Sequence, residues 1–303
     1  MRGQSHDHGV EAALSGTDQG VRATWLSLGG LAVTALAQLV IVVISGSVAL
    51  LADTIHNFTD ALTAIPLLIA FRLGRRPPNA RYTYGYSRAE DLAGVAIVLM
   101  IAASAVVAAI EAARRLMRPD PIEHAWLVLV AGVLGFLGNE AVALYRIRVG
   151  KRIGSAALVA DGLHARTDGL TSLGVVISAV AAIGGVERAD AIVGLLITLV
   201  IGWTLWEATR TVLRRLLDGT DEMTITLIEG VAAAIPGVEH VNDTKARWVG
   251  HALRAELSVD VDPALTVREG HDITEEVRDA LLHGVPRLSE AVVHVDPHEH
   301  DGD

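Results

Sequence analysis

The chain has 303 residues, of which 51% are hydrophobic and 20% charged, and its formal net charge is −10 at pH 7. This composition is too apolar for an ordinary soluble domain and too charged for a membrane bundle alone, so we expect two parts of different character. There is no cysteine. Disulfides and thiolate metal sites are therefore excluded, and any bound metal must use histidine nitrogen and carboxylate oxygen.

The charges are distributed unevenly along the chain. Before Asp218 there are 19 basic and 16 acidic residues, whereas from Asp218 onward there are 19 acidic and 6 basic residues with 7 histidines. An acidic tail attracts cations and repels nucleic acid, so we expect no nucleic-acid partner. The expected regions are a flexible His-containing tail (1–20), a six-helix transmembrane domain (21–217), a cytoplasmic α+β domain (218–297) and an acidic His-containing tail (298–303).

Six apolar stretches approach the roughly 20 residues that cross a bilayer core of about 30 Å. In chain order they are residues 23–45, 47–71, 92–110, 125–145, 153–186 and 191–206. Lys and Arg collect in the loops after the second and fourth stretches and after the sixth, which places that side in the cytoplasm. Arg114, Arg115 and Arg118 go against this rule. The balance predicts an inner or plasma membrane protein with both termini cytoplasmic and lipid around the helices.

The second and fifth stretches contain nearly the same sequence. Residues 50–63 read LLADTIHNFTDALT and residues 158–171 read LVADGLHARTDGLT, with eight of fourteen positions identical. Each copy contains Asp-x-x-His-x-x-x-Asp. An ionised carboxylate inside a membrane is costly, and ionisable residues there are functional by default. The alternative, polar groups that only hold helices together by hydrogen bonds, does not need matched sets of this kind.

The spacing of the motif has a geometric meaning. Residues four apart share one helix face, so His56 and Asp60 point the same way, as do His164 and Asp168. Two helices packed with these faces inward offer two imidazoles and two carboxylates to one point. That set suits tetrahedral Zn²⁺, with Co²⁺, Cd²⁺ or Fe²⁺ as other candidates, and disfavours Mg²⁺ and Ca²⁺, which want oxygen alone.

The first acid of each motif copy, Asp53 or Asp161, stands three residues before the histidine and near the same face. Three roles are open for these acids: fixing the histidine tautomer, carrying protons, or pairing with Arg166. Arg166 lies two residues from His164 and so on another side of the helix. We expect it to pair with Glu140 or with an aspartate.

These segments resemble the cation diffusion facilitator family of zinc and related metal exporters. The resemblance is carried by GSVALLADTIHNFTDALTAIP (46–66), YTYGYSRAEDLAG (82–94) and ALVADGLHARTDGLTSLGV (157–175). It implies that His56, Asp60, His164 and Asp168 form the transport site, and that a homodimer exchanges Zn²⁺ for protons by alternating access. Some relatives carry a second metal site between the second and third spans. Here residues 79–86 offer neither His nor Asp, so that site is expected to be missing.

The tail predicts a small αββαβ domain. The expected elements are a helix over 222–235, strands over 238–249 and 251–261, a helix over 266–282 opened by a capping box of Thr266 and Glu269, and a strand over 291–295. The resemblance implies a ferredoxin-like cytoplasmic domain that dimerises and senses metal.

Candidate metal ligands in this domain are five residues: His240, His251, His271, His294 and Asp296. His271, His294 and Asp296 match the resemblance best, and strand alternation places the last two on one face. Solvated histidines on an acidic domain are an equal alternative, and Asn242 and Ser258 occupy positions that would complete a family-type site. The His-containing clusters at 6–8 and 298–300 either catch metal loosely or are plain tails.

The predicted function is proton-coupled efflux of Zn²⁺ from the cytoplasm, in which metal and protons compete for the same lone pairs. The chain has no GxxxxGK[ST] loop for ATP and no HExxH motif for an intramembrane metalloprotease, so an enzyme is not expected. The remaining alternative is a membrane metal sensor or scaffold that binds metal without transporting it. Zn²⁺ is expected as transported substrate and as a candidate regulatory ion in the tail.

Overall fold

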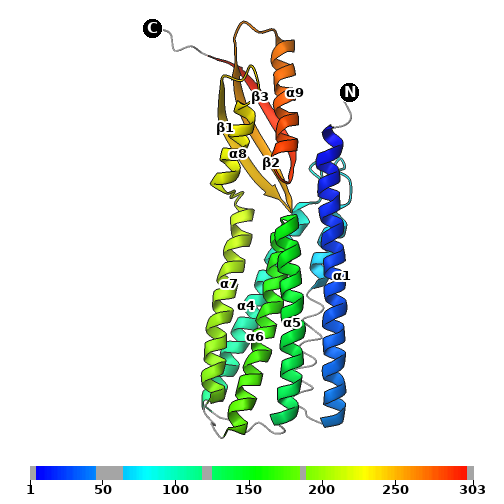
Figure 1. Cartoon of the computed structure of the whole chain (residues 1–303), viewed down its shortest axis with the longest axis vertical. Helices are drawn as coiled ribbons and strands as arrows, with labels where there is room; N and C mark the ends of the chain where they lie inside the picture. Colours follow the sequence, from blue (N-terminus) through cyan, green and yellow to red (C-terminus); the bar gives the residue numbers. More distant parts are fainter. Residues whose placement is uncertain (1–4, 46–63, 118–124, 185–188, 299–303) are drawn as a thin grey trace. The chain divides into compact units, whose positions relative to one another are not determined.

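The computed structural model describes residues 5–45, 64–117, 125–184 and 189–298 (Figure 1). Its described elements separate into two compact units, residues 19–212 and residues 1–18 with 213–303. The division lies five residues before the boundary that the change of charge predicts at Asp218. The predicted fold class, a helical membrane protein with a C-terminal α+β domain, is confirmed.

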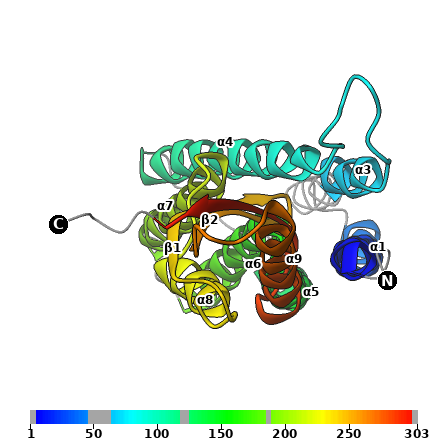
Figure 2. The same ribbon diagram turned by 90° about the horizontal axis from the view of Figure 1, so that it is seen from above.

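The first unit is built from helices. In chain order they are α1 (Ser5–Ser45), α3 (Ala64–Gly74), α4 (Arg88–Met117), α5 (Ala125–Ile153), α6 (Ala156–Ile183) and α7 (Ala189–Leu216). The first residues of α1, up to Asp18, and the last residues of α7, from Leu213, are assigned to the second unit. α1 begins at Ser5, within the segment predicted as a flexible tail. Seen end-on to α1, α4 lies inclined to it and α3 lies beside α4 (Figure 2).

Four of these helices are long and apolar enough to cross a membrane, over residues 15–44, 88–114, 126–153 and 192–216. α6 has 28 residues, the same length as α7, but carries the charged motif. α3 is a shorter apolar helix at the end of the second predicted span, whose earlier part lies outside the described residues. The count of six spans therefore stays a prediction. Large apolar side chains such as Val43, Leu99, Leu199 and Trp203 are exposed, as lipid contact requires.

α5 and α6 pack as a close antiparallel pair because glycines line their contact. A Cβ on Gly150 would lie 2.9 Å from the backbone nitrogen of Val159, and one on Gly162 would lie 3.0 Å from that of Ile147. Small residues let helix backbones approach in this way. Without side chains at these positions, the α6 backbone sits directly against α5, and this fixes where α6 presents its polar residues.

The C-terminal domain has the predicted αββαβ order. Its elements are α8 (Glu222–Ala233), β1 (His240–Val249), β2 (Ala252–Val261), α9 (Val267–Gly284) and β3 (Leu288–Pro297). The sheet order is β1-β2-β3, with β1 antiparallel and β3 parallel to β2. The predicted capping box is present, since the Thr266 hydroxyl accepts from Glu269 N–H and Glu269 accepts from Thr266 N–H. These bonds from Thr266, the side-chain one first, lower the pKa of the exposed Glu269.

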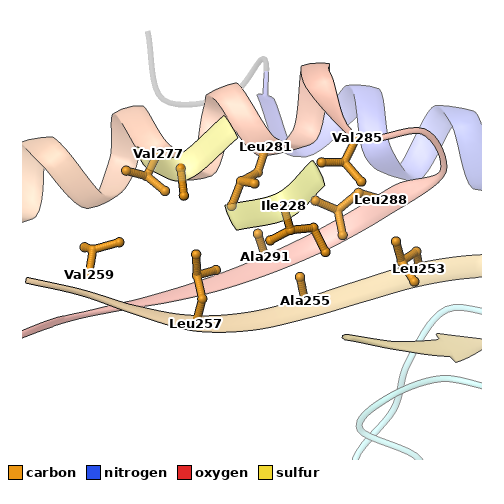
Figure 3. Packing of buried hydrophobic residues seen from close by; sticks show 11 residues of the cluster. Ile228, Leu253, Ala255, Leu257, Val259, Val277, Leu281, Val285, Leu288 and Ala291 are labelled. Carbon is orange, nitrogen blue, oxygen red and sulfur yellow. The ribbon is translucent and has the colours of Figure 1, made fainter. Parts of the chain in front are cut away.

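Both helices cover one face of the sheet. Leu253, Leu257 and Val259 alternate along β2 and meet Ile228 of α8 and Leu281 of α9 in the core (Figure 3). The opposite face of the sheet carries the intervening polar residues. At one end of it, Arg247 pairs with Glu256 at 3.3 Å and Arg254 with Glu290 at 3.0 Å. His240 and His294 lie toward the other end of this open face.

Candidate metal site

The α6 half of the predicted transport site is buried within the helical unit. His164 and Asp168 expose 2% and 5% of their surface. The distance from His164 Nδ1 to Asp168 Oδ1 is 4.0 Å, which the i,i+4 spacing of the helix produces. Zn–N and Zn–O bonds are each about 2.0–2.1 Å long, so one zinc ion placed between His164 Nδ1 and Asp168 Oδ1 could bind both atoms. A tetrahedral angle would draw the two atoms to about 3.3 Å, which requires only a small side-chain adjustment.

The other half of the predicted site, His56 and Asp60, lies outside the described residues, as does Asp53. Across the described part of the chain, no group of three or more His, Asp or Glu side chains is arranged to hold a metal ion. A metal ion held by His164 and Asp168 would therefore need a second pair of ligands from elsewhere. A tetrahedral ion needs that second pair.

Asp161, one turn before His164, is fully buried and pairs with Arg146 of α5. The distance from Arg146 Nη1 to Asp161 Oδ2 is 3.0 Å, and the two side chains expose 1% and 0% of their surface. Sequence reasoning considered Arg166 as the partner of Asp161 and did not identify Arg146. Two positions in different helices, fifteen residues apart, give no periodic signal of contact.

Arg166 pairs instead with Glu140 of α5, one of the two partners that the sequence left open. Arg166 Nη2 donates to Glu140 Oε1 at 2.9 Å and Arg166 Nε donates to Glu140 Oε2 at 3.3 Å. This bidentate geometry is the strong form of an arginine–carboxylate pair. Arg166 thus pairs with Glu140 rather than with an aspartate and ties α6 to α5.

In the C-terminal domain, His294 and Asp296 lie on one face of β3 as predicted. His294 Nε2 is 3.1 Å from Asp296 Oδ1, and both side chains are largely open to solvent. His251 lies in the turn directly before β2, whereas Ser258 of β2 is the residue paired with His294. At about 3.3 Å per residue, His251 lies some 20 Å from His294. His271 is exposed on α9, which covers the opposite face. Within one protomer, His251 and His271 lie apart from the pair of His294 and Asp296.

His298, the first residue of the predicted terminal tail, follows β3 directly and makes contacts with the domain. Its backbone N–H donates to Val261 O at 2.8 Å. Its ring lies between two carboxylates, with Nδ1 3.6 Å from Asp260 and Nε2 3.7 Å from Glu239. The His240 ring lies 4.8 Å away, centre to centre. Because the carboxylates flank opposite ring nitrogens, one metal ion could not join both of them to His298.

Two family models match the two parts of the chain. Residues 24–217 match the cation efflux transmembrane domain, and residues 220–298 match the cytoplasmic domain of cation efflux proteins. The chain belongs to the cation efflux family. Members of this family move metal cations across membranes, so the protein is an integral membrane transporter of metal cations and not an enzyme.

Several relatives cover nearly the whole chain. The probable cation efflux system protein Rv2025c of Mycobacterium tuberculosis (strain H37Rv) is 55% identical over 298 residues, covering 98% of this chain and 90% of the relative. The manganese efflux system protein MneS of Bacillus subtilis (strain 168) is 28% identical, covering 90% of this chain and 94% of MneS. The cation-efflux pump FieF of Serratia proteamaculans (strain 568) is 27% identical, covering 88% and 91%.

Solved structures of one protein's C-terminal domain are also similar to this chain. The cadmium form of a single-residue variant of the MamM C-terminal domain covers 26% of this chain and 98% of its own, with 33% identity and a TM-score of 0.25. The nickel form of another variant of the same domain covers 26% and 100%, with 32% identity and a TM-score of 0.26.

Proposed function

We propose that this cation efflux protein exports Zn²⁺ from the cytoplasm in exchange for protons. The observation that carries the proposal is the buried pair of His164 and Asp168, 4.0 Å apart on α6. One imidazole and one carboxylate per helix, repeated by His56 and Asp60, make a set of two nitrogens and two oxygens. Zinc favours such a set, whereas manganese suits sites of carboxylate, carbonyl and water.

Cd²⁺, Co²⁺ and Fe²⁺ share enough of zinc's ligand preference to be secondary cargoes. Mn²⁺ is the cargo to test against zinc, because one relative is named as a manganese efflux protein. Metal binding requires neutral histidine and ionised aspartate, so protons arriving from the far side displace the ion. That competition couples export to the proton gradient without ATP.

The architecture that completes this function is also proposed. Six spans with both termini in the cytoplasm place the acidic domain where it meets cytoplasmic metal. The parts are the tail (1–20), the transmembrane domain (21–217), the cytoplasmic domain (218–297) and the terminal tail (298–303), with His298 belonging to the domain by its contacts. Two copies form a homodimer, which would let His251, His271, His294 and Asp296 meet across protomers as a regulatory metal site.

The proposal can be tested by measuring Zn²⁺ flux into proteoliposomes that contain the protein, with an imposed proton gradient. The unmutated protein should accumulate Zn²⁺, and Asp168→Asn or Asp60→Ala should abolish uptake because each removes one anionic ligand. Glu207→Gln is the matched control, since Glu207 is an exposed acid on α7 outside the site. Zinc uptake by the Asp168→Asn protein equal to that of the control would overturn the proposal. Zinc binding without flux in the unmutated protein would identify a sensor or scaffold instead.

A further inference from the structure

The buried pair between Arg146 and Asp161 is costly to keep. Both side chains are essentially inaccessible, yet within the described part of the chain Arg146 Nε and Nη2 make no hydrogen bond. Burying two charges costs several kcal/mol per ion, and an incompletely hydrogen-bonded pair is often no more stable than apolar residues of the same size. Stability alone therefore does not explain why α5 and α6 carry this pair.

The position of Asp161 suggests what the pair does. Asp161, His164 and Asp168 follow one another at three- and four-residue spacing along α6, and all three are buried. At 1.5 Å rise per residue, Asp161 is about 4.5 Å from His164 along the helix axis. Without a partner, its carboxylate would be a third anionic oxygen donor beside the proposed metal site.

Arg146 is held firmly where it meets Asp161. A Cβ on the neighbouring Gly162 would lie 3.1 Å from the Arg146 Cβ and 3.0 Å from the Ile147 nitrogen, so the backbones are in contact at this level. This contact places the Arg146 side chain directly against α6 at the level of Asp161. Asp161 faces a fixed positive charge, 3.0 Å from its Oδ2.

We infer that Arg146 is a positioning residue that sets metal selectivity by keeping the Asp161 carboxylate out of the cargo site. This inference rests on the proposed function of His164 and Asp168 as metal ligands. With Asp161 neutralised, the site has two nitrogens and two oxygens and suits zinc. Released from Arg146, Asp161 adds a carboxylate and a negative charge, which favours oxygen-preferring cations such as Mn²⁺.

The experiment compares Zn²⁺ and Mn²⁺ transport by the full-length protein in proteoliposomes, with KM and maximal rate measured for each metal. Arg146→Met should raise the Mn²⁺/Zn²⁺ ratio of maximal rate over KM at least tenfold, mainly through a lower KM for Mn²⁺. Arg146→Lys, which keeps the charge, should restore the original ratio. The double variant Arg146→Met/Asp161→Asn has no carboxylate at position 161, so its Mn²⁺/Zn²⁺ ratio should equal that of the unmutated protein.

A general loosening of the α5–α6 contact would leave the double variant as altered as Arg146→Met, and that result would overturn the inference. An unchanged ratio in Arg146→Met would do the same. If Arg146→Met does not fold, Arg146→Gln keeps a donor toward Asp161 without the charge, and its ratio must rise. Absence of flux for every divalent ion in the unmutated protein would instead refute the proposed function, so the two failures are distinguishable.

Discussion

The contact between α5 and α6 at Gly162 makes a sharp prediction. In Gly162→Ala, the added Cβ would meet the Ile147 Cγ1 at 2.7 Å and the Ile147 backbone nitrogen at 3.0 Å. The side-chain atom can move aside, but the nitrogen moves only with α5. To reach 3.4 Å, where ordinary contact begins, the two backbones must separate locally by 0.4 Å.

Two opposing effects set the magnitude. Overpacking a tight contact typically costs about 1–3 kcal/mol. Replacing glycine by alanine within a helix recovers up to about 1 kcal/mol of helix propensity. Gly202→Ala on α7 is the matched control, because its Cβ would meet nothing within 4 Å. Both variants gain the same propensity, so Gly162→Ala should be less stable than Gly202→Ala by about 1–3 kcal/mol.

The assay has two readouts on the full-length protein. Thermal unfolding in detergent should give a lower melting temperature for Gly162→Ala than for Gly202→Ala. Zinc flux in proteoliposomes should fall severalfold in Gly162→Ala alone, because the displacement carries His164 and Asp168 with it. Equal melting temperatures and equal flux in the two variants would refute the claim that this crossing is closely packed and holds the site.

Three further predictions concern other contacts. Leu281→Ala leaves a cavity at a fully buried position in the core of the C-terminal domain. It should lower the free energy of unfolding of this domain by about 2–5 kcal/mol, measured as faster hydrogen exchange of the α9 amides. Unchanged exchange would contradict the assignment of Leu281 to the core. The pKa of Glu269 is lower in the folded protein than its value of about 4.3 in the unfolded chain. The ionised carboxylate therefore stabilises the folded protein above about pH 4.3, and this stabilisation is lost as the pH falls through the folded-state pKa. Thr266→Ala should therefore weaken the acid dependence of exchange in the first turn of α9, and an undiminished dependence would contradict the capping role. Glu140→Gln, which leaves the partly buried Arg166 charge without its carboxylate, should lower the free energy of unfolding in detergent by about 1–3 kcal/mol. Changing both residues to Met should lower it less, because no unpaired charge is left.

Local patterns predicted much of the C-terminal domain. The capping box at Thr266 and Glu269 and the alternation of Leu253, Leu257 and Val259 along β2 are signals read within a few residues. The contacts of His298 were not predicted, because its backbone bond to Val261 joins residues far apart in the chain.

In the membrane domain, the repeated motif located His164 and Asp168 because helical spacing converts directly into a shared face. The ion-pair partners of the charged residues on α6 were harder to predict. Glu140 was one of two candidates for Arg166, whereas Arg146 was not considered for Asp161 at all. Which residues of α5 face α6 depends on how the two helices cross, and that depends on the glycine contacts at Gly150 and Gly162.

The same glycine contacts restrict how α6 can move. Turning α6 about its own axis by one residue, about 100°, would bring Asp161 or Leu163 to the place where Gly162 now faces the Ile147 nitrogen at 3.0 Å. Neither side chain fits there, so the contact opposes a turn of α6 by one residue against α5. We expect α5 and α6 to move together as one rigid unit, so that any change of helix angle during transport occurs at their contacts with other helices. In mechanical terms, this half of the protein is built for hinge motion and resists shear.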